Sequence, residues 1–499
     1  MEFKNIGHLL ASKVAALNEK PFLFAEKDAR EWSYREFNRA VDRTANLLLS
    51  RGITKGGVVS LLLPNSPEYI IAYFACWKIG ALAGPINSLL KPEEIEWVIA
   101  NSEAKLLLVG SEFLESIPAA MKDPTVVFDN IEEATDDQGE DVSGVDISPD
   151  DEAIIIYTSG TTGKPKGCLL THANLIANAR QISEWMKFGP EDRLLTIMPL
   201  FHMNAVSVTT MTALFAGAST VVSPKFSASR FWDIVEKYQI TSFGSVATML
   251  SMLLAKAELP VRVGKNLRFA MCGSAPVPAE VLTKFEETFG CLVIEGYGLS
   301  ESTCRSTFNP PDKSRRPGSC GKPIGNEMKV FDESDEEVSD GELGEIVLRG
   351  PNIFKEYFRN PGATAKAFAG GWFHTGDIGY RDDDGFFYIA DRKSDMIIRG
   401  GENIYPREID DLLYTHPAIA AAAVIGVPDE LYGEEVAAFV VLKNGSSVTE
   451  AEVIEFCKKH LADFKCPKTI HFVEDIPKGP TGKLLKRELA KLFDQLKNT

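Results

Sequence analysis

Residues 157–167 combine side chains that suit a polyphosphate ligand. They read Tyr-Thr-Ser-Gly-Thr-Thr-Gly-Lys-Pro-Lys-Gly and follow the apolar run 153–156. Glycines let backbone amides turn toward an anion, while hydroxyl and ammonium groups donate to phosphate oxygens. A polar turn between two strands is the alternative, but two lysines in a segment of this length favour phosphate binding. The spacing differs from the common nucleotide loop G-x-x-x-x-G-K-[ST].

Two further segments carry side chains for a nucleotide. Gly296-Tyr297-Gly298-Leu299-Ser300-Glu301 follows the apolar residues 292–294, and Gly371–Asp377 reads Gly-Trp-Phe-His-Thr-Gly-Asp. A flat base can lie against Tyr297, Glu301 offers a hard oxygen to Mg²⁺, and Asp377 can accept both hydrogens of a ribose diol. Taken alone, a G-Y-G turn and an aspartate in a turn are more often structural.

Together these motifs resemble the adenylate-forming enzymes, which include acyl- and aryl-CoA synthetases, luciferases and peptide-synthetase adenylation domains. The resemblance extends over roughly residues 15–490, with the main motifs in order. Within this family, the sequence is most similar to acyl- or aryl-CoA ligases. It implies that Tyr297 contacts adenine, that Ser300 (where the family usually has Thr) contacts the α-phosphate, and that Asp377 and Arg392 hold the ribose.

The resemblance also implies the full set of nucleotide and catalytic residues. Lys483, in the terminal Pro-Thr-Gly-Lys motif, matches the family's catalytic lysine, and Glu301 its magnesium ligand. The expected catalytic residues are Lys483, Glu301, Ser300 and His202. The expected ATP-binding residues are Thr158, Ser159, Gly160, Thr161, Thr162, Gly163, Lys166, Gly273, Ser274, Ala275, Gly296, Tyr297, Gly298, Asp377, Arg392 and Lys483.

His202 bears on the acid that is activated. In the resembling family this position lines the acyl pocket, and amino-acid-activating members commonly place Asp there. A histidine cannot neutralise an ammonium group at neutral pH, so we expect a carboxylic acid without an α-amino group. The expected pocket comprises His202, Met203, Phe243, Val246, Met249 and Gly298, with ordinary core packing as the rival interpretation.

The last hundred residues hold the implied CoA site and hinge. Two consecutive glycines permit a close backbone approach to an extended ligand arm. The expected CoA-binding residues are Arg399, Gly400, Gly401, Phe464, Lys465 and Lys468. Cys466 stands where several relatives have a basic residue, and Ser394 stands at the family's hinge, where Asp or Lys is usual.

Apolar periodicity predicts the elements that carry these residues. It indicates helices at 32–50 and 67–78 and strands at 58–63, 81–85 and 105–109, an alternation typical of parallel α/β sheets with ligands at the strand ends. Residues 318–390 favour a small β-rich subdomain, and an α+β unit follows. We therefore expect an α/β fold of stacked sheets over 1–392 and a mobile lid domain over 393–499.

The composition limits which binding partners and which cellular compartment we expect. The 499-residue chain has a net charge of −17 and no basic block, which argues against nucleic acid. Eight cysteines without C-x-x-C spacing suggest reduced thiols, and neither a signal peptide nor a transmembrane segment is indicated, so we expect a cytoplasmic protein. The sequence does not determine the oligomeric state, and a homodimer is one alternative.

The expected function is therefore an acid–CoA ligase that uses ATP, CoA and Mg²⁺ on a fatty, aryl or carnitine-like acid. Three alternatives remain at this point. They are an acyl-AMP ligase that passes the acyl group to a carrier protein, a luciferase-like enzyme, and a nucleotide-binding homologue without turnover. The 399–403 loop disfavours the first, and the joint presence of Lys483 and Glu301 disfavours the last.

Overall fold

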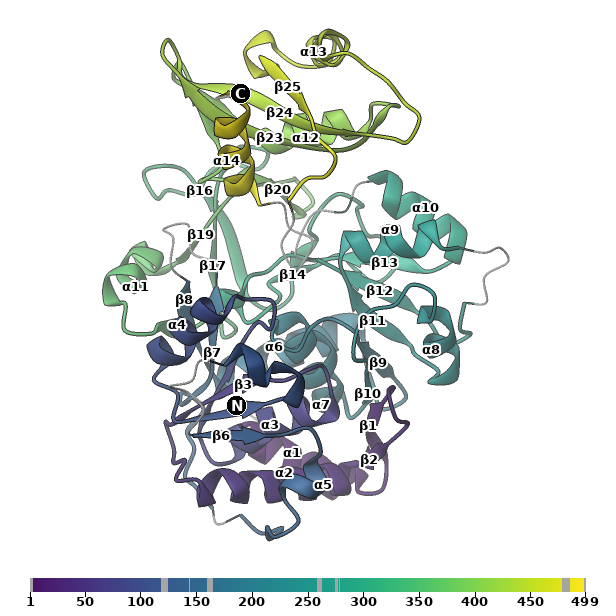
Figure 1. Ribbon diagram of the computed structural model, residues 1–499, viewed down its shortest axis with the longest axis vertical. Coiled ribbons are helices and arrows are strands. Elements are labelled where there is room, and N and C mark those ends of the chain that lie inside the picture. Colours follow the sequence, from purple (N-terminus) through teal and green to yellow (C-terminus); the bar gives the residue numbers. More distant parts are fainter. Residues whose placement is uncertain are drawn as a thin grey trace.

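The computed structural model describes residues 3–117, 124–142, 144–158, 165–257, 263–273, 277, 279–477 and 485–497. The chain forms a large body of stacked sheets and helices, on which a smaller C-terminal unit sits (Figure 1). This agrees with the expected α/β fold with a large and a small part.

One seven-stranded sheet contains β7 and β8, the strands before and after the segment predicted to bind phosphate. Its order is β18-β8-β7-β4-β3-β5-β6, and β3 to β7 run parallel while β8 and β18 run antiparallel. The strands are β3 (Val58–Leu62), β4 (Leu82–Pro85), β5 (Leu106–Val109), β6 (Thr125–Val127), β7 (Glu152–Thr158), β8 (Lys166–Thr171) and β18 (Glu356–Tyr357).

In a second seven-stranded sheet, β12 and β13 end just before Gly273 and Gly296, two of the expected ATP-binding residues. Its order is β13-β12-β11-β9-β10-β1-β2, parallel except for the edge strand β2. The strands are β1 (Pro21–Ala25), β2 (Glu31–Ser33), β9 (Arg193–Thr196), β10 (Ser219–Val222), β11 (Ser242–Ser245), β12 (Phe269–Cys272) and β13 (Leu292–Glu295).

Helix α3 (Pro67–Lys78) lies between the two sheets, in contact with β1 on one side and β3 and β4 on the other. All its residues except Lys78 are buried. Its polar ring atoms are satisfied: the Tyr73 hydroxyl donates to the Leu200 carbonyl at 2.7 Å and Trp77 Nε1 to the Ala153 carbonyl at 2.9 Å. The helix therefore fixes one sheet against the other.

The remaining helices and short turns of the large body cover the sheets. They are α1 (Ile6–Leu17), α2 (Tyr34–Ser50), α4 (Pro92–Ser102), η1 (Ser111–Ser116), α5 (Ile131–Ala134), α6 (His172–Met186), the π-helix η3 (Asn204–Met211), α7 (Thr212–Ala216), α8 (Phe231–Lys237), α9 (Ala247–Ala255), α10 (Ala279–Phe289), η4 (Ser300–Ser302), α11 (Pro361–Ala367) and η5 (Ala369–Gly371). The apolar face predicted for 32–50 is confirmed, since Phe37, Val41 and Leu48 of α2 are fully buried.

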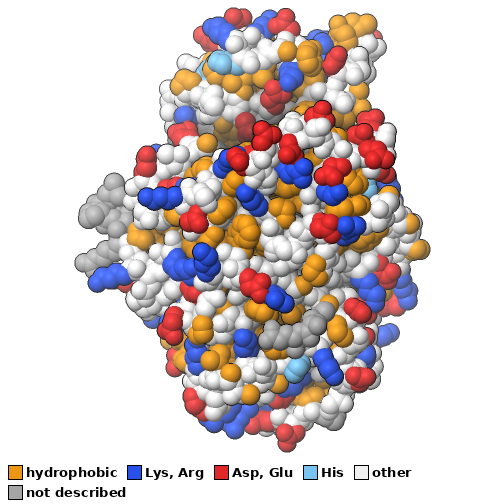
Figure 2. All heavy atoms as spheres, turned by 180° about the vertical axis from the view of Figure 1, so that it is seen from behind, with side chains coloured by type: hydrophobic (Ala, Val, Ile, Leu, Met, Phe, Trp, Pro, Cys, Tyr) orange, Lys and Arg blue, Asp and Glu red, His pale blue; other side chains and the backbone are white. Residues whose placement is uncertain are grey.

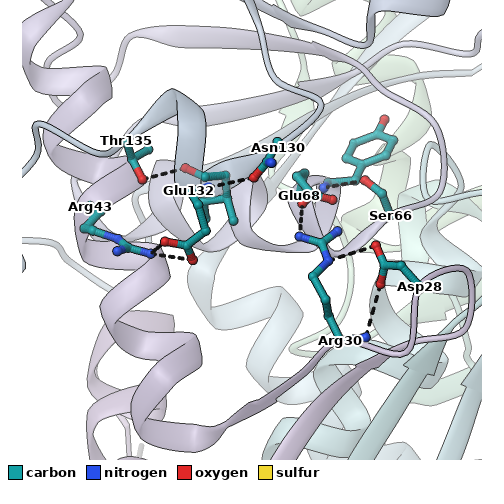
Figure 3. Close-up of polar contacts among 10 residues, drawn as sticks. Asp28, Arg30, Arg43, Ser66, Glu68, Asn130, Glu132 and Thr135 are labelled. Carbon is teal, nitrogen blue, oxygen red and sulfur yellow. Dashed lines mark hydrogen bonds and ion pairs between the residues drawn. The ribbon is translucent and has the colours of Figure 1, made fainter.

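Polar side chains join the N-terminal elements (Figure 3). Arg30 bridges Asp28 and Glu68 at 2.8 Å each, and Glu68 is buried in the first turn of α3. Both carboxylate oxygens of Glu132 accept from Arg43 at 2.8 Å, which ties α5 to α2. A paired buried carboxylate is tolerated where an unpaired one is costly, so the Arg30 contact satisfies Glu68 at the start of α3. The exposed Glu132–Arg43 pair adds a weaker link between α5 and α2.

The predicted β-rich subdomain is a four-stranded antiparallel sheet of order β16-β17-β19-β20, with a small β14-β15 ladder beside it. The strands are β14 (Thr307–Phe308), β15 (Lys322–Pro323), β16 (Glu327–Phe331), β17 (Gly344–Arg349), β19 (Phe373–Arg381) and β20 (Phe387–Arg392). The register sets Asp377 directly opposite Arg392.

The C-terminal unit has its own five-stranded sheet, in which β22, β21, β24 and β23 follow one another and β25 pairs with β24. Its elements are β21 (Ile397–Arg399), β22 (Glu402–Ile404), α12 (Pro406–Tyr414), β23 (Ile419–Asp429), β24 (Gly433–Leu442), α13 (Glu450–Lys458), η6 (Asp463–Lys465), β25 (Thr469–Phe472) and α14 (Lys486–Lys497). Separate apolar clusters of residues 397–493 fill both faces of this sheet.

The surface carries charge of both signs. Figure 2 shows acidic and basic side chains interspersed on one face, over the large body and the C-terminal unit alike. Among the described residues, no helix is both long enough and apolar enough to cross a bilayer.

Candidate active site

A polar triad around the buried Asp377 joins two motifs that lie 80 residues apart. The Tyr297 hydroxyl donates to Asp377 Oδ2 at 2.5 Å, and Arg392 Nε lies 2.7 Å from Asp377 Oδ1. Asp377 is only 3% exposed, so both of its oxygens are held by neighbours. Burial and the adjacent Asp377 charge raise the pKa of Tyr297 well above its usual value, which keeps the phenol a donor.

Arg392 connects this triad to the phosphate side. Burial lowers the pKa of its guanidinium, but the charges of Asp377 and Glu301 more than offset this, so the pKa lies above its usual value. The side chain is about one third exposed, at 32%. A permanent cation is thus held beside the two predicted nucleotide motifs.

Glu301 occupies the junction between the two large sheets. It follows β13 in the short turn η4, and its Oε1 accepts from the Tyr357 hydroxyl at 2.9 Å and from Thr158 Oγ1 at 3.5 Å. Thr158 ends β7, and Lys166, which begins β8, is its register partner. The structure therefore brings Glu301, Thr158 and Lys166 together as predicted.

Tyr357 is a site residue that the motifs did not reveal. Its ring lies 4.9 Å from Lys166 Nζ while its hydroxyl holds Glu301. It reaches the site because the two-residue strand β18 pairs with β8. Nothing in the local sequence signals such a short pairing.

Glycines line the carboxyl ends of β12 and β13. A side chain at Gly273 would meet the Arg305 guanidinium at 2.6 Å, one at Gly296 would meet the Phe308 ring at 2.4 Å, and one at Gly298 would meet the Cys304 carbonyl oxygen at 1.9 Å. Only glycine allows these segments to approach. Carboxyl ends of parallel strands are where such sheets bind ligands, which suits the predicted adenine-side turn. Ser300 begins η4 beside them.

Among the predicted acyl-pocket residues, His202 has an unpartnered polar atom, whereas the apolar side chains belong to the main core. His202 precedes η3, its Nε2 is buried without a hydrogen-bond partner among the described residues, and burial lowers its pKa to about 4. It is therefore neutral at pH 7. Met203, Val246 and Met249 are buried in the main core. Phe243 packs on Phe231 with ring centroids 4.8 Å apart, which favours the core interpretation for that residue.

Contacts of the predicted CoA residues fall into two sets in the C-terminal unit, one around Glu435 and one around Glu408. Gly400 and Gly401, with φ of 60° and 93°, form the turn between β21 and β22. Arg399 Nε lies 2.6 Å from Glu435 Oε1, and Lys468 Nζ lies 3.9 Å from Glu435 Oε2. Lys465 instead pairs with Glu408 at 2.7 Å, beside Phe464 of the same turn.

Ser394 lies between the last strand of the subdomain and the C-terminal sheet. Its hydroxyl donates to Asp395 Oδ1 at 3.1 Å. The two parts are also joined by Arg407, whose backbone N–H donates to Asp391 Oδ2 at 2.8 Å. A hinge at Ser394 stays a prediction.

Several predicted residues lie outside the part of the chain that the structure describes. These are Ser159, Gly160, Thr161, Thr162, Gly163, Ser274, Ala275 and Lys483. Their roles stay predictions.

Two buried polar side chains near the site were not singled out by sequence. Asn204, the first residue of η3, has both amide atoms buried without partners among the described residues. Arg305 is 2% exposed, and its Nε and Nη2 are unpartnered in the same sense. No motif marks either residue.

The carboxylate at Glu301 fits Mg²⁺. Mg²⁺ binds proteins through one or two carboxylates and completes its shell with water and substrate phosphates. Glu301 is 9% exposed, beside the Thr158 hydroxyl and opposite the Lys166 strand end. A single hard-oxygen ligand beside phosphate-binding groups is what such a site needs.

Comparisons with known proteins find matches to two models of one enzyme family, and these matches cover most of the chain. The AMP-binding enzyme model matches residues 10–358, and the AMP-binding enzyme C-terminal domain model matches residues 408–483. Oxalate–CoA ligase from Arabidopsis thaliana is 37% identical over 91% of this chain and 92% of the relative. Crotonobetaine/carnitine–CoA ligase from Citrobacter koseri is 35% identical over 97% of each. The structure of ATP-bound MatB from Rhodopseudomonas palustris superposes with a TM-score of 0.93 at 32% identity, over 99% of each chain.

Proposed function

Because the chain belongs to the AMP-binding enzyme family, we propose that it is an ATP-dependent acid–CoA ligase that works in two half-reactions. In the first, a carboxylate attacks the α-phosphorus of ATP, giving acyl-AMP and diphosphate. In the second, the CoA thiol attacks the acyl carbon, giving acyl-CoA and AMP. The observation that supports this best is the contact of Tyr297 and Arg392 with the buried Asp377, which brings together distant motifs that are expected to hold a nucleoside.

The first half-reaction must bring two anions together. A carboxylate is a poor acyl donor, and linking it to AMP supplies a leaving group. Arg392, Lys166 and Lys483 provide positive charge against the crowded phosphates, and preorganised charges of this kind typically contribute several kcal/mol to the transition state. Mg²⁺ on Glu301 would neutralise phosphate charge. Asp377 orients the ribose, so that the α-phosphate faces the acid.

The second half-reaction needs a different face of the small domain. Residues 393–499 turn about Ser394, which withdraws Lys483 and brings the Gly400–Gly401 turn to the acyl-AMP. The pantetheine arm then passes along this turn, and Arg399, Phe464, Lys465 and Lys468 face the CoA nucleotide. One acid pocket thereby serves both halves. A cytoplasmic location and a homodimer stay predictions.

Diphosphate release tests the proposal. The full-length protein is assayed with ATP, Mg²⁺ and a panel of fatty, aryl, carnitine-like and short acids, with CoA and without it. We expect multiple turnovers only with CoA, and acyl-CoA as the product. Single-turnover release that CoA does not accelerate would instead favour transfer to a carrier protein. No release with any acid would favour the non-catalytic alternative.

A further inference from the structure

Arg305 is a buried cation without an anion. It is 2% exposed, and within the described residues its Nε and Nη2 have no hydrogen-bond partner and its guanidinium joins no ion pair. Its backbone, by contrast, is fixed, because the carbonyl accepts from Asn178 Nδ2 at 2.7 Å and from Asn352 Nδ2 at 3.2 Å. The backbone is thus held in place, while Nε and Nη2 of the side chain have no partner among the described residues.

Such a group is unfavourable unless something pairs with it. A guanidinium stays protonated at any ordinary pH, and an unpaired buried charge is among the costliest features a fold can hold. The Phe308 ring, 5.4 Å from Cζ, offsets only part of that cost. The nearby carboxylates are engaged elsewhere: Glu301 with Tyr357, and Glu295 with the Gly318 N–H at 3.0 Å. The missing anion is therefore best supplied by a ligand.

The guanidinium lies where an expected ATP-binding residue, Gly273, and an expected acyl-pocket residue, Gly298, come together. It faces Gly273 just past β12, where an added side chain would come within 2.6 Å of Nη1 and Nη2. Gly298, an expected pocket residue, lies against the Arg305 backbone, since a side chain there would be 2.8 Å from Arg305 Cα. Arg305 thus borders the expected acyl pocket at its junction with the expected nucleotide site.

A second unsatisfied group approaches the same face of the sheet. Gly244 pairs in register with Met271, and Gly273 is two residues on, so Gly244 and Gly273 share one face. A side chain at Gly244 would meet Asn204 Oδ1 at 2.6 Å, and both amide atoms of Asn204 are unpartnered among the described residues. Neighbouring strands lie about 4.8 Å apart, so Asn204 and Arg305 approach the same face from adjacent strand ends.

We propose that Arg305, with Asn204 beside it, binds a second acidic group at the far end of the acid substrate. The substrate class is then a short acid with two anionic groups, of which one is activated and the other is held by Arg305. A fatty or aryl monoacid would leave the guanidinium unpaired, and the quaternary ammonium of a carnitine-like acid would repel it. This inference rests on the proposed function and specifies its substrate.

The test compares matched acids in the wild-type enzyme and in Arg305→Met. Oxalate, malonate and succinate are paired with acetate, propionate and butyrate, which keep the chain length but lack the second carboxylate. With wild type we expect kcat/KM at least 100-fold higher for one diacid than for its monoacid. In Arg305→Met this diacid activity should fall at least 100-fold, while monoacid turnover stays or rises.

Two further measurements separate binding from structure. Without ligand, Arg305→Met should unfold at the same or a higher temperature, because an unpaired buried charge is removed. Arg315→Met is the control: the Arg315 side chain is 10% exposed and pairs with Glu286, so its loss should lower the unfolding temperature and leave the diacid-to-monoacid ratio unchanged. Arg305→Lys should restore part of the diacid preference.

The outcomes distinguish the two claims. If no acid releases diphosphate, the proposed function fails. If monoacids turn over as well as diacids in wild type, or if Arg305→Met lowers activity with all acids equally, the ligase stands and the role of Arg305 is overturned.

Discussion

At the residue scale, the two carboxylate oxygens of Asp377 have different partners, the Tyr297 hydroxyl and the Arg392 guanidinium. Asp377→Asn replaces one acceptor by a donor, which must face either Arg392 or the Tyr297 hydroxyl. Buried hydrogen bonds to charged groups are worth about 1.5–3 kcal/mol, so we expect KM for ATP to rise roughly 10- to 100-fold in ATP–diphosphate exchange.

The matched control is Asp384→Asn, in the exposed turn that follows the same strand. We expect it to leave KM for ATP within about twofold, because an exposed ion pair contributes little. Equal effects of the two substitutions would show that Asp377 does not contact the nucleotide.

Glu295, at the end of β13, makes stability depend on pH. Burial raises its pKa to about 7 from the ordinary 4.5, although the Gly318 N–H and Arg315 oppose the shift. Between these values the folded protein holds a proton that the unfolded chain has released, so unfolding releases a proton and the free energy of unfolding falls as pH rises. At full size a shift of this kind is worth about 3 kcal/mol.

Glu295→Gln should remove that dependence while keeping an oxygen for the Gly318 N–H. Thermal unfolding at pH 5 and pH 8 measures it: the variant should lose less stability than wild type on going to pH 8. Parallel pH profiles of the two proteins would contradict the prediction.

At the element scale, the turn between β13 and η4 depends on a missing side chain. A Cβ at Gly298 would lie 1.9 Å from the Cys304 carbonyl oxygen, which is backbone and cannot rotate away. Gly298→Ala should therefore displace the turn that carries Ser300 and Glu301, cost about 1–3 kcal/mol and reduce acyl-AMP formation severely. Denaturant unfolding and diphosphate exchange measure the two effects.

Gly362→Ala provides the comparison. Gly362 lies in helix α11 with nothing within 4 Å of the added carbon, so the substitution should stabilise by about 0.5–1 kcal/mol and leave activity unchanged. If Gly298→Ala behaves in the same way, the packing of this turn is unimportant for the site.

Sequence predicts elements whose signals are local. Helix 67–78 was expected with both ends correct, because Ser66 caps it, Pro67 begins it and the apolar run stops at Lys78. The hairpin of β21 and β22 was missed, since each strand has three residues and pairing depends on the turn and on β24. Tyr357 and Arg305 were missed for a related reason, because their roles arise from contacts distant in sequence.

At the scale of the whole molecule, polar contacts among the described residues join the large body to the small unit. Arg407 of α12 reaches Asp391, and the Lys393 N–H donates to the Gly376 carbonyl at 2.8 Å. The apolar clusters of the C-terminal sheet consist of its own residues. A unit with its own core and a polar joint can turn without exposing that core, which is what the exchange of half-reactions requires.

This exchange predicts opposite defects from two positions in the small unit. Lys483→Ala should abolish acyl-AMP formation, by 100-fold or more, yet largely spare acyl-CoA formation from supplied acyl-AMP. Gly401→Leu should do the reverse: nothing lies within 4 Å of its Cβ, so the fold accommodates the side chain, but the turn that receives the pantetheine arm is covered. The two half-reactions are measured separately, by diphosphate exchange and by thioester release.

Strain has to be separated from obstruction in this test. Gly401 has a φ of 93°, where leucine is unfavourable, so a defect could arise from the backbone alone. Gly445→Leu is the control, because Gly445 also has positive φ, at 78°, and open space around its Cβ, and it lies in a turn after β24. We expect Gly445→Leu to keep both half-reactions while Gly401→Leu loses only the second. Loss of both halves in Lys483→Ala, or of neither in Gly401→Leu, would mean that one arrangement of the two parts serves the whole reaction.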